Sequence, residues 1–166
     1  MAFTAKPIRI GRIPGGGQEN VVALPYEAAE TFLLGAVLTV TSNELVQMSD
    51  DPTADIAGIA LQGAGTNPGQ DAANSPVVIT GVFVGVSMAL ADTVTQYVSD
   101  ITDGTTSDVA TVPTAADIGT TIGLILRADG TWAADRDATG TVITILDIDV
   151  DNNSVIWKFT AAAPQL

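Results

Sequence analysis

Residues 77–90 read VVITGVFVGVSMAL and form the densest run of β-branched residues in the chain. Side chains of a strand alternate between two faces, and one face of this run is almost entirely apolar. It consists of Val78, Thr80, Val82, Val84, Val86, Met88 and Leu90. The other face has glycines at positions 81 and 85, where a bend or a second backbone can approach. We expect this stretch to be the central strand of a buried sheet.

A transmembrane helix is the competing interpretation of this run. A helix needs about 20 apolar residues to cross a bilayer. Residues 77–90 are too few, and Thr80 and Ser87 lie among them. We therefore expect a soluble chain with no membrane partner.

Composition narrows the class of protein further. The chain has 166 residues, which is enough for one domain with a substantial core. Hydrophobic residues make up 46% and charged residues 15%, so the formal net charge of −13 belongs to a folded surface rather than to a disordered tail. Such a surface repels nucleic acid and anionic membranes, and we expect neither as a partner.

The sequence contains no cysteine and no histidine. This excludes disulfides, thiolate nucleophiles, the common zinc sites and any catalytic triad that uses imidazole as its base. The first residues also lack the apolar segment of a secretory signal, which favours synthesis in a cytoplasm. We expect no enzymatic activity, no metal and no cofactor.

Residues 1–18 combine three of the six basic residues with two prolines and a glycine triplet. This composition predicts an extended N-terminal arm, followed by a single β-rich domain over residues 19–166. A phosphate-binding loop is excluded, because no Lys followed by Ser or Thr comes after the glycines. A frayed terminus is the alternative to a functional arm. If the segment is an arm, deletion of residues 2–14 leaves the domain folded.

Isoleucines alternate with bases in this arm, as in a segment that lies on a neighbouring subunit. The residues expected to contact a partner are Lys6, Ile8, Arg9, Ile10, Arg12 and Ile13.

Beyond residue 18, short apolar runs alternate with Gly, Pro, Asn and Asp. We expect strands at 32–34, 36–40, 44–48, 56–61, 77–90, 93–99, 121–127, 131–135, 141–150 and 155–159, and helical turns near 25–30 and 114–118. Asp129-Gly130 favours a tight hairpin, Gly58 marks a close approach, and residues 62–76 form a long loop. About ten short strands with one or two helical turns predict an all-β fold, an antiparallel β-barrel or β-sandwich.

Three alternating acids resemble the start of a calcium-binding loop: Asp147, Asp149 and Asp151. The loop is incomplete, because Asn152 stands where glycine is needed and Lys158 stands where a bidentate glutamate is needed. A solvated face of an edge strand is the better interpretation.

Neighbouring carboxylates suggest acid–base catalysis at Asp50-Asp51 and at Asp135 with Asp137. Neither pair has a supporting motif, and loop aspartates commonly cap turns. The two tryptophans, at 132 and 157, can stack on a sugar or anchor an interface, although such aromatic residues more often belong to the core.

Three passages resemble the small β-rich decoration, or cement, proteins of tailed-bacteriophage heads. They are FLLGAVLTVTSNELVQMSDDPTADIAGIALQG (32–63), VVITGVFVGV (77–86) and DIGTTIGLILRADGTWAADRD (117–137). The resemblance implies a structural virion protein on the outer surface of an expanded capsid. There it would bridge neighbouring subunits of the major capsid protein as a homo-oligomer, with a trimer favoured over a dimer. The alternatives are another β-rich virion component, such as a head fibre base or tail protein, a carbohydrate-binding module, and a trimeric enzyme acting through carboxylates.

Overall fold

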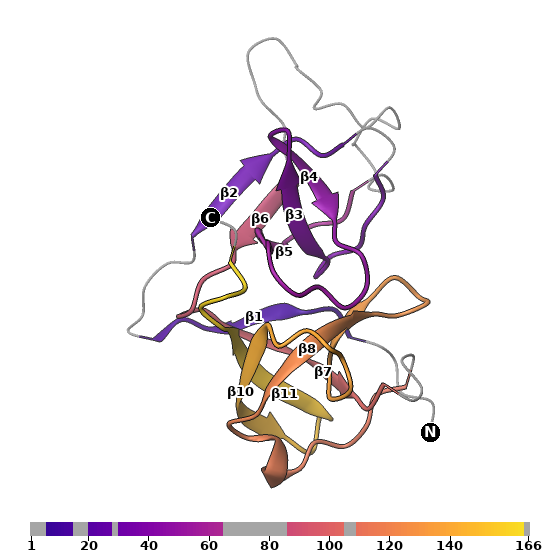
Figure 1. The fold of residues 1–166 in the computed structure, drawn as a ribbon, viewed down its shortest axis with the longest axis vertical. Helices are drawn as coiled ribbons and strands as arrows, with labels where there is room; N and C mark the ends of the chain where they lie inside the picture. Colours follow the sequence, from indigo (N-terminus) through magenta and orange to yellow (C-terminus); the bar gives the residue numbers. More distant parts are fainter. Residues whose placement is uncertain (1–5, 15–19, 28–29, 65–85, 105–108, 165–166) are drawn as a thin grey trace.

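The regular structure of the chain is almost entirely β (Figure 1). The computed structural model describes residues 6–14, 20–27, 30–64, 86–104 and 109–164. Within them lie eleven strands and the 3-10 turn Ala115–Asp117. The strands are β1 (Arg9–Arg12), β2 (Val21–Leu24), β3 (Val37–Thr41), β4 (Glu44–Gln47), β5 (Gly58–Ala60), β6 (Val86–Leu90), β7 (Gln96–Thr102), β8 (Thr121–Leu126), β9 (Trp132–Asp135), β10 (Ile143–Asp149) and β11 (Ser154–Phe159).

Six strands form a sheet that closes into a barrel, at the bottom of Figure 1. Their order is β1-β7-β11-β10-β8-β9, and a further pairing of β7 with β9 closes the ring. One edge of β7 is shared, because its first residues pair with β1 and its last two pair with β9. The β7–β9 ladder is parallel, whereas the other ladders between described strands are antiparallel. The predicted all-β class is confirmed.

The other five strands form a second sheet, in the order β2-β6-β5-β3-β4, which lies above the barrel in Figure 1. β6 is the described end of the expected central strand, and it is an interior strand flanked by β2 and β5. Val86 and Met88 are buried, as the period of two predicted. Residues 77–85, and the expected loop from residue 65 onward, lie outside the described residues. Gly58 of β5 is indeed a close approach, because a Cβ there would overlap the carbonyl oxygen of Ala89.

Buried side chains from both sheets form one continuous apolar cluster. In the barrel its centre is aromatic: the rings of Tyr97 and Trp157 stack at 4.9 Å, and Phe159 meets both rings edge-on. Trp157 Nε1 donates a hydrogen bond of 2.9 Å to Ser99 Oγ, so its polar atom is satisfied inside the core. Val155, Trp157 and Phe159 stand at alternate positions of the strand expected at 155–159, and all three are buried, as the period of two of a strand requires.

Local turn chemistry explains the best-predicted elements. In the β8–β9 hairpin, Gly130 has φ +84°, and the Asp129 carboxylate accepts a 2.9 Å hydrogen bond from the Thr131 backbone N–H. Ser42 and Asn43 both have positive φ and join β3 to β4. The expected helical turn near 114–118 is present as the 3-10 turn.

Other boundaries differ from the expectation. The strand expected at 32–34 is absent: Phe32 makes only an isolated bridge to Ala64, and the chain then turns at Gly35, whose φ is +83°. β2 was not anticipated. The helical turn expected at 25–30 includes residues outside the described set, and Tyr26 forms a bridge to Leu45 instead.

The described part of the N-terminal segment, residues 6–14, does not form a separate arm. Arg9–Arg12 pair with β7 as part of the barrel sheet, and Ile8 is only 1% exposed. Ile10 packs against the same core. The physical reason is the alternation of isoleucine and arginine, which gives the segment one apolar face that the barrel buries. Deletion of residues 2–14 would therefore remove core side chains, and we no longer expect it to leave the domain intact.

Candidate interaction site

One face of the barrel sheet points away from the core, and the strand register determines which residues it carries. Arg9 pairs with Val98, Val98 pairs with Ile156, and Ile156 pairs with Asp147. Residues directly opposite each other in adjacent strands share a face. A row of four side chains therefore crosses β1, β7, β11 and β10, and each of them is half-buried or exposed.

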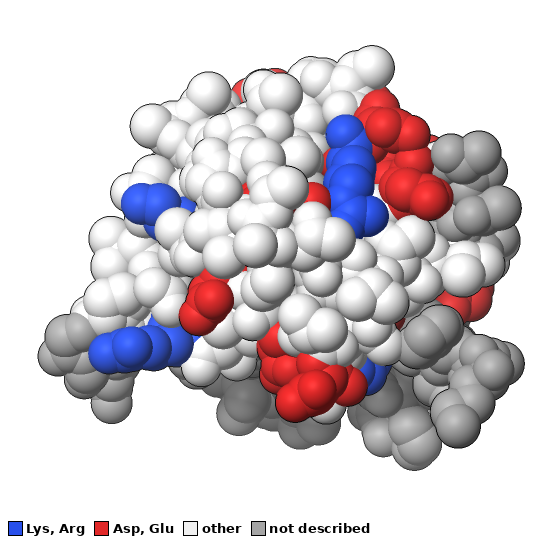
Figure 2. All heavy atoms as spheres, turned by 90° about the horizontal axis from the view of Figure 1, so that it is seen from below, with Lys and Arg blue, Asp and Glu red and all other residues white. Residues whose placement is uncertain are grey.

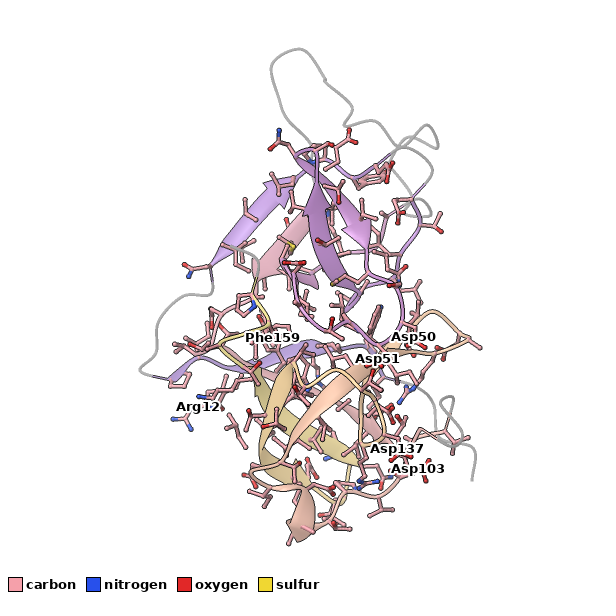
Figure 3. All side chains as sticks on the ribbon, in the orientation of Figure 1. Arg12, Asp50, Asp51, Asp103, Asp137 and Phe159 are labelled. Carbon is pink, nitrogen blue, oxygen red and sulfur yellow. The ribbon has the colours of Figure 1, made fainter. Side chains whose placement is uncertain are left out.

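A groove of about 360 Å³ opens on this face. It is called the β1 groove here and is lined by Gly11, Arg12, Gln96, Val98, Leu146, Asp147 and Ile156. Figure 3 shows the Arg12 side chain extending outward from the barrel.

Two irregularities in strand pairing shape the β1 groove. The register shifts between Ile10 and Arg12, and it shifts again between Ile145 and Asp147. The second shift leaves Leu146 and Asp147 together in the groove wall. At the first shift, a Cβ on Gly11 would lie 2.6 Å from Cγ2 of Val98, so a larger residue would displace this wall.

The six expected contact residues do not act together. Arg9 and Arg12 are exposed on the outer face of β1, and Ile13, which follows β1, is half-buried. Lys6 is tied to its own chain, since its backbone N–H donates to Asp100 Oδ2 at 3.0 Å and its Nζ donates to the Asn152 carbonyl at 2.6 Å.

The assignment of Ile8 and Ile10 to a partner contact is corrected by the structure. Ile8 is buried in the core of this chain and is not available to a capsid or to a second subunit, and the partly buried Ile10 packs against the same core.

Basic residues divide into an internal and an external group. Arg127 and Asp100 form a buried ion pair at 3.2 Å. Arg136 binds the carboxylate of Asp117 at 2.8 Å, and this hydrogen bond is the main reason that the pKa of Arg136 is raised. Both pairs stabilise the fold and leave no charge for a partner.

The external group lies on the face that carries the β1 groove. Arg9 and Arg12 belong to β1, and Lys158 is two residues beyond Ile156 in β11, which puts it on the same face. Among the described residues, none of these three side chains has an ion-pair partner. Figure 2, which views the barrel end from below, shows basic side chains at its left apart from most acidic ones.

Neighbouring carboxylates are already engaged in the fold. Asp50 Oδ1 accepts a 2.8 Å hydrogen bond from the Leu126 backbone N–H. Asp51 accepts from both the backbone N–H and the hydroxyl of Thr139, and from the Gly140 backbone N–H at 2.8 Å. Burial opposes ionisation of Asp51, but these hydrogen bonds together outweigh burial and lower its pKa. The two aspartates therefore tie the chain between β4 and β5 to the barrel, Asp50 at the end of β8 and Asp51 at the segment between β9 and β10 (Figure 3).

The second carboxylate pair is also structural in part. Asp135 is 2% exposed and accepts a 2.8 Å hydrogen bond from the Thr102 hydroxyl. Asp137 lies near Asp103 on the opposite side of the barrel from Arg12 in Figure 3. The described residues contain no group of three or more acidic side chains arranged to hold a metal ion.

The alternating acids of β10 behave as a solvated row. Asp147 and Asp151 are exposed, and Asp149 binds the Asn152 side chain at 2.7 Å. Hydrogen bonds from the side chain and backbone of Asn152 lower the pKa of Asp149. The row therefore organises the turn between β10 and β11.

The structure argues against a sugar-binding role for the two tryptophans. Trp132 is 1% exposed and Trp157 is fully buried, so neither ring can stack on a sugar.

A second hollow, of about 250 Å³, lies between the chain at 31–33, β4 and the β8–β9 hairpin. It is mainly apolar, with Phe32, Leu33 and Ala64 in its lining, and no basic residue lines it. Within the described parts of the chain, no helix is long and apolar enough to span a membrane.

The chain matches no protein-family model, no curated protein and no solved structure.

Sequence analysis missed Lys158 and the apolar part of the groove, Val98, Leu146 and Ile156. Their strands are far apart in sequence, and only the barrel pairing brings them together. The one available signal was the alternation of inward and outward residues in the last strand, where Ile156 and Lys158 occupy the outward positions.

Proposed function

We propose that this chain is a structural protein of a tailed-phage virion. In this proposal it binds the outer surface of the expanded capsid as a homo-oligomer, a trimer, and bridges neighbouring subunits of the major capsid protein. The basis is the resemblance of residues 32–63, 77–86 and 117–137 to phage decoration proteins, together with the all-β fold.

The observation that carries the proposal is the basic face of the barrel. The chain has a net charge of −13, yet Arg9, Arg12 and Lys158 share one face and make no ion pair among the described residues. Arginine and lysine at an exposed face contribute most when a partner supplies the opposite charge. An exposed basic face whose charges have no partner within the described part of the chain is suited to binding another protein.

The carboxylates argue for the same class of protein. Asp50, Asp51 and Asp135 accept hydrogen bonds from backbone or hydroxyl groups of the fold. A general acid or base must instead reach a substrate proton. The arrangement therefore favours a structural role over catalysis through these groups.

The proposed mechanism is mass action. A protein that binds only the expanded lattice stabilises that lattice in proportion to the logarithm of its saturation. Three linked copies multiply weak single-site contacts, because the second and third contacts form at a high effective concentration. Local adhesion then resists the pressure of the packaged genome.

The test uses undecorated capsids in two states. Purified protein is mixed with expanded capsids and, separately, with unexpanded procapsids, both are pelleted, and bound copies are counted. Saturable binding to the expanded shells alone is the expected result, and light scattering of the free protein should give the mass of a trimer. Failure to bind either shell would reject the proposed function.

A further inference from the structure

We propose that the β1 groove binds an acidic segment of a partner protein, in which carboxylates flank an apolar side chain. Under the proposed function that segment belongs to the capsid shell, and in this respect the inference rests on it. The argument uses the shape of the groove, its apolar lining and the charges around it.

The groove is suited to a side chain that is not charged. Val98 and Ile156 are register partners in adjacent strands, and Leu146 lies beside them in the wall. These three side chains are only partly buried within the chain, so an apolar residue of a partner would remove more of their surface from water. Burial of apolar area is favourable by about 25 cal/mol per Å².

The rim of the groove determines which neighbours that apolar residue can have. Arg12 lines the groove, and Arg9 stands at the end of the row that continues through Val98 and Ile156. Lys158 lies on the same face, opposite Thr144. Asp147 is the one acid in the lining, and Asp149, two residues further along β10, lies on the same face, so three positive charges on this face stand against two negative ones.

Charge complementarity therefore selects an acidic protein segment. Arginine binds carboxylates through a planar set of donors, which an extended peptide can meet on either side of its apolar residue. Nucleic acid also carries negative charge, but it brings a dense array of phosphates toward a chain of net charge −13. A peptide with a few carboxylates avoids most of that repulsion.

The edge position of β1 does not by itself explain these charges. Edge strands often carry bases that block pairing with another sheet. Lys158, however, lies in β11, which is paired on both sides by β7 and β10. A basic residue on an interior strand of the same face serves no such protective purpose.

The experiment measures the full chain against two fluorescein-labelled peptides, one of alternating Glu and Leu and one of alternating Lys and Leu, by fluorescence anisotropy. The variant Arg9→Gln/Arg12→Gln/Lys158→Gln removes three positive charges from the groove face. The matched control makes the same change in net charge at exposed positions outside the groove, with Thr53→Glu/Ala116→Glu/Ala161→Glu.

The expected result is binding of the Glu-Leu peptide that weakens with salt, with at least a tenfold loss in the groove variant but not in the control. The Lys-Leu peptide, which the net charge of −13 attracts, should bind the groove variant at least as well as the wild type. Absence of Glu-Leu binding, equal loss in both variants, or an equal loss of both peptides in the groove variant would overturn the inference. Circular dichroism and thermal unfolding verify that both variants are folded.

Two further readouts separate this inference from the proposed function. Capsid pelleting with the same proteins tests the function, and a chain that binds the acidic peptide through the groove but no capsid would reject the function and keep the inference. Light scattering tests the other occupant, a second copy of the chain. If the groove variant changes the oligomeric state, the face is a subunit contact and the inference is overturned.

Discussion

Replacement of Asp117 by asparagine should destabilise the protein in a manner that depends on pH. Asp117 is 7% exposed, and its carboxylate accepts hydrogen bonds of 2.8 Å from both Nε and Nη2 of Arg136. It also accepts from the Thr114 backbone N–H at 2.6 Å. Arg136 Nη1 also donates a hydrogen bond of 2.6 Å to Thr111 Oγ1. The Asp117–Arg136 pair therefore connects the chain at 111–117 to the residue that follows β9.

The magnitude follows from the pKa of Asp117. Hydrogen bonding to Arg136 is the largest cause that lowers it, from 3.8 to about 2. One pKa unit corresponds to 1.36 kcal/mol, so the ionised carboxylate contributes about 2 kcal/mol to the free energy of unfolding. The folded pKa is depressed, so this contribution is fully present above the unfolded pKa and is lost as the pH falls through the folded value.

The assay is urea unfolding of the wild type and of Asp117→Asn, followed by tryptophan fluorescence at pH 7, 4 and 2. The difference in unfolding free energy should be about 2 kcal/mol at pH 7 and less than about 0.5 kcal/mol at pH 2. Other carboxylates titrate in both proteins and cancel in the difference. Asp151→Asn, at an exposed position of the β10–β11 turn, is the control and should cost less than about 0.5 kcal/mol at pH 7.

A difference between wild type and Asp117→Asn that stays constant from pH 7 to pH 2 would refute the reasoning. It would mean that the side chain stabilises the chain at 111–117 by its shape and neutral hydrogen bonds rather than by its charge.

Three further substitutions test the packing by the same urea assay at pH 7. Ile8→Ala should cost about 3 kcal/mol, because Ile8 is 1% exposed, whereas a residue of a detached arm would cost almost nothing. Gly58→Ala should cost about 2 kcal/mol, since the new Cβ would overlap the Ala89 carbonyl oxygen; an unchanged midpoint would show that β5 and β6 can separate. Asp100→Asn should cost about 3 kcal/mol, because it leaves the buried Arg127 guanidinium without its counter-charge, and a cost below about 1 kcal/mol would argue against that ion pair.

The internal ion pairs bear on how the function is tested. Arg127 and Arg136 stabilise the fold, so their replacement would reduce any binding activity through loss of structure. Arg9, Arg12 and Lys158 make no such contacts among the described residues and can be replaced to test binding alone. For the same reason, point substitutions on β1 are a cleaner test than deletion of residues 2–14, which would also remove Ile8 from the core.

Local chemistry, read from the sequence, determined the class of fold and most hairpins. Alternating apolar residues in short runs predict strands, and the pairs Ser42-Asn43 and Asp129-Gly130 supply the backbone conformations that tight turns need. The shared inward orientation of Val155, Trp157 and Phe159 follows from the period of two. These features depend on a few neighbouring residues, and this is why they are visible in the chain itself.

Only the tertiary structure decided where the N-terminal segment lies and which residues make the groove. An isoleucine that alternates with arginine packs equally well on its own barrel or on another subunit, and the sequence does not distinguish these two outcomes. Ile8 and Ile10 pack on this chain's own core because β9 pairs with only the last two residues of β7 on one edge. The first residues of β7 are left to pair with β1. Val98, Leu146 and Ile156 come from β7, β10 and β11 and meet only through the pairing of these strands. The local sequence pattern therefore could not predict that they share a surface.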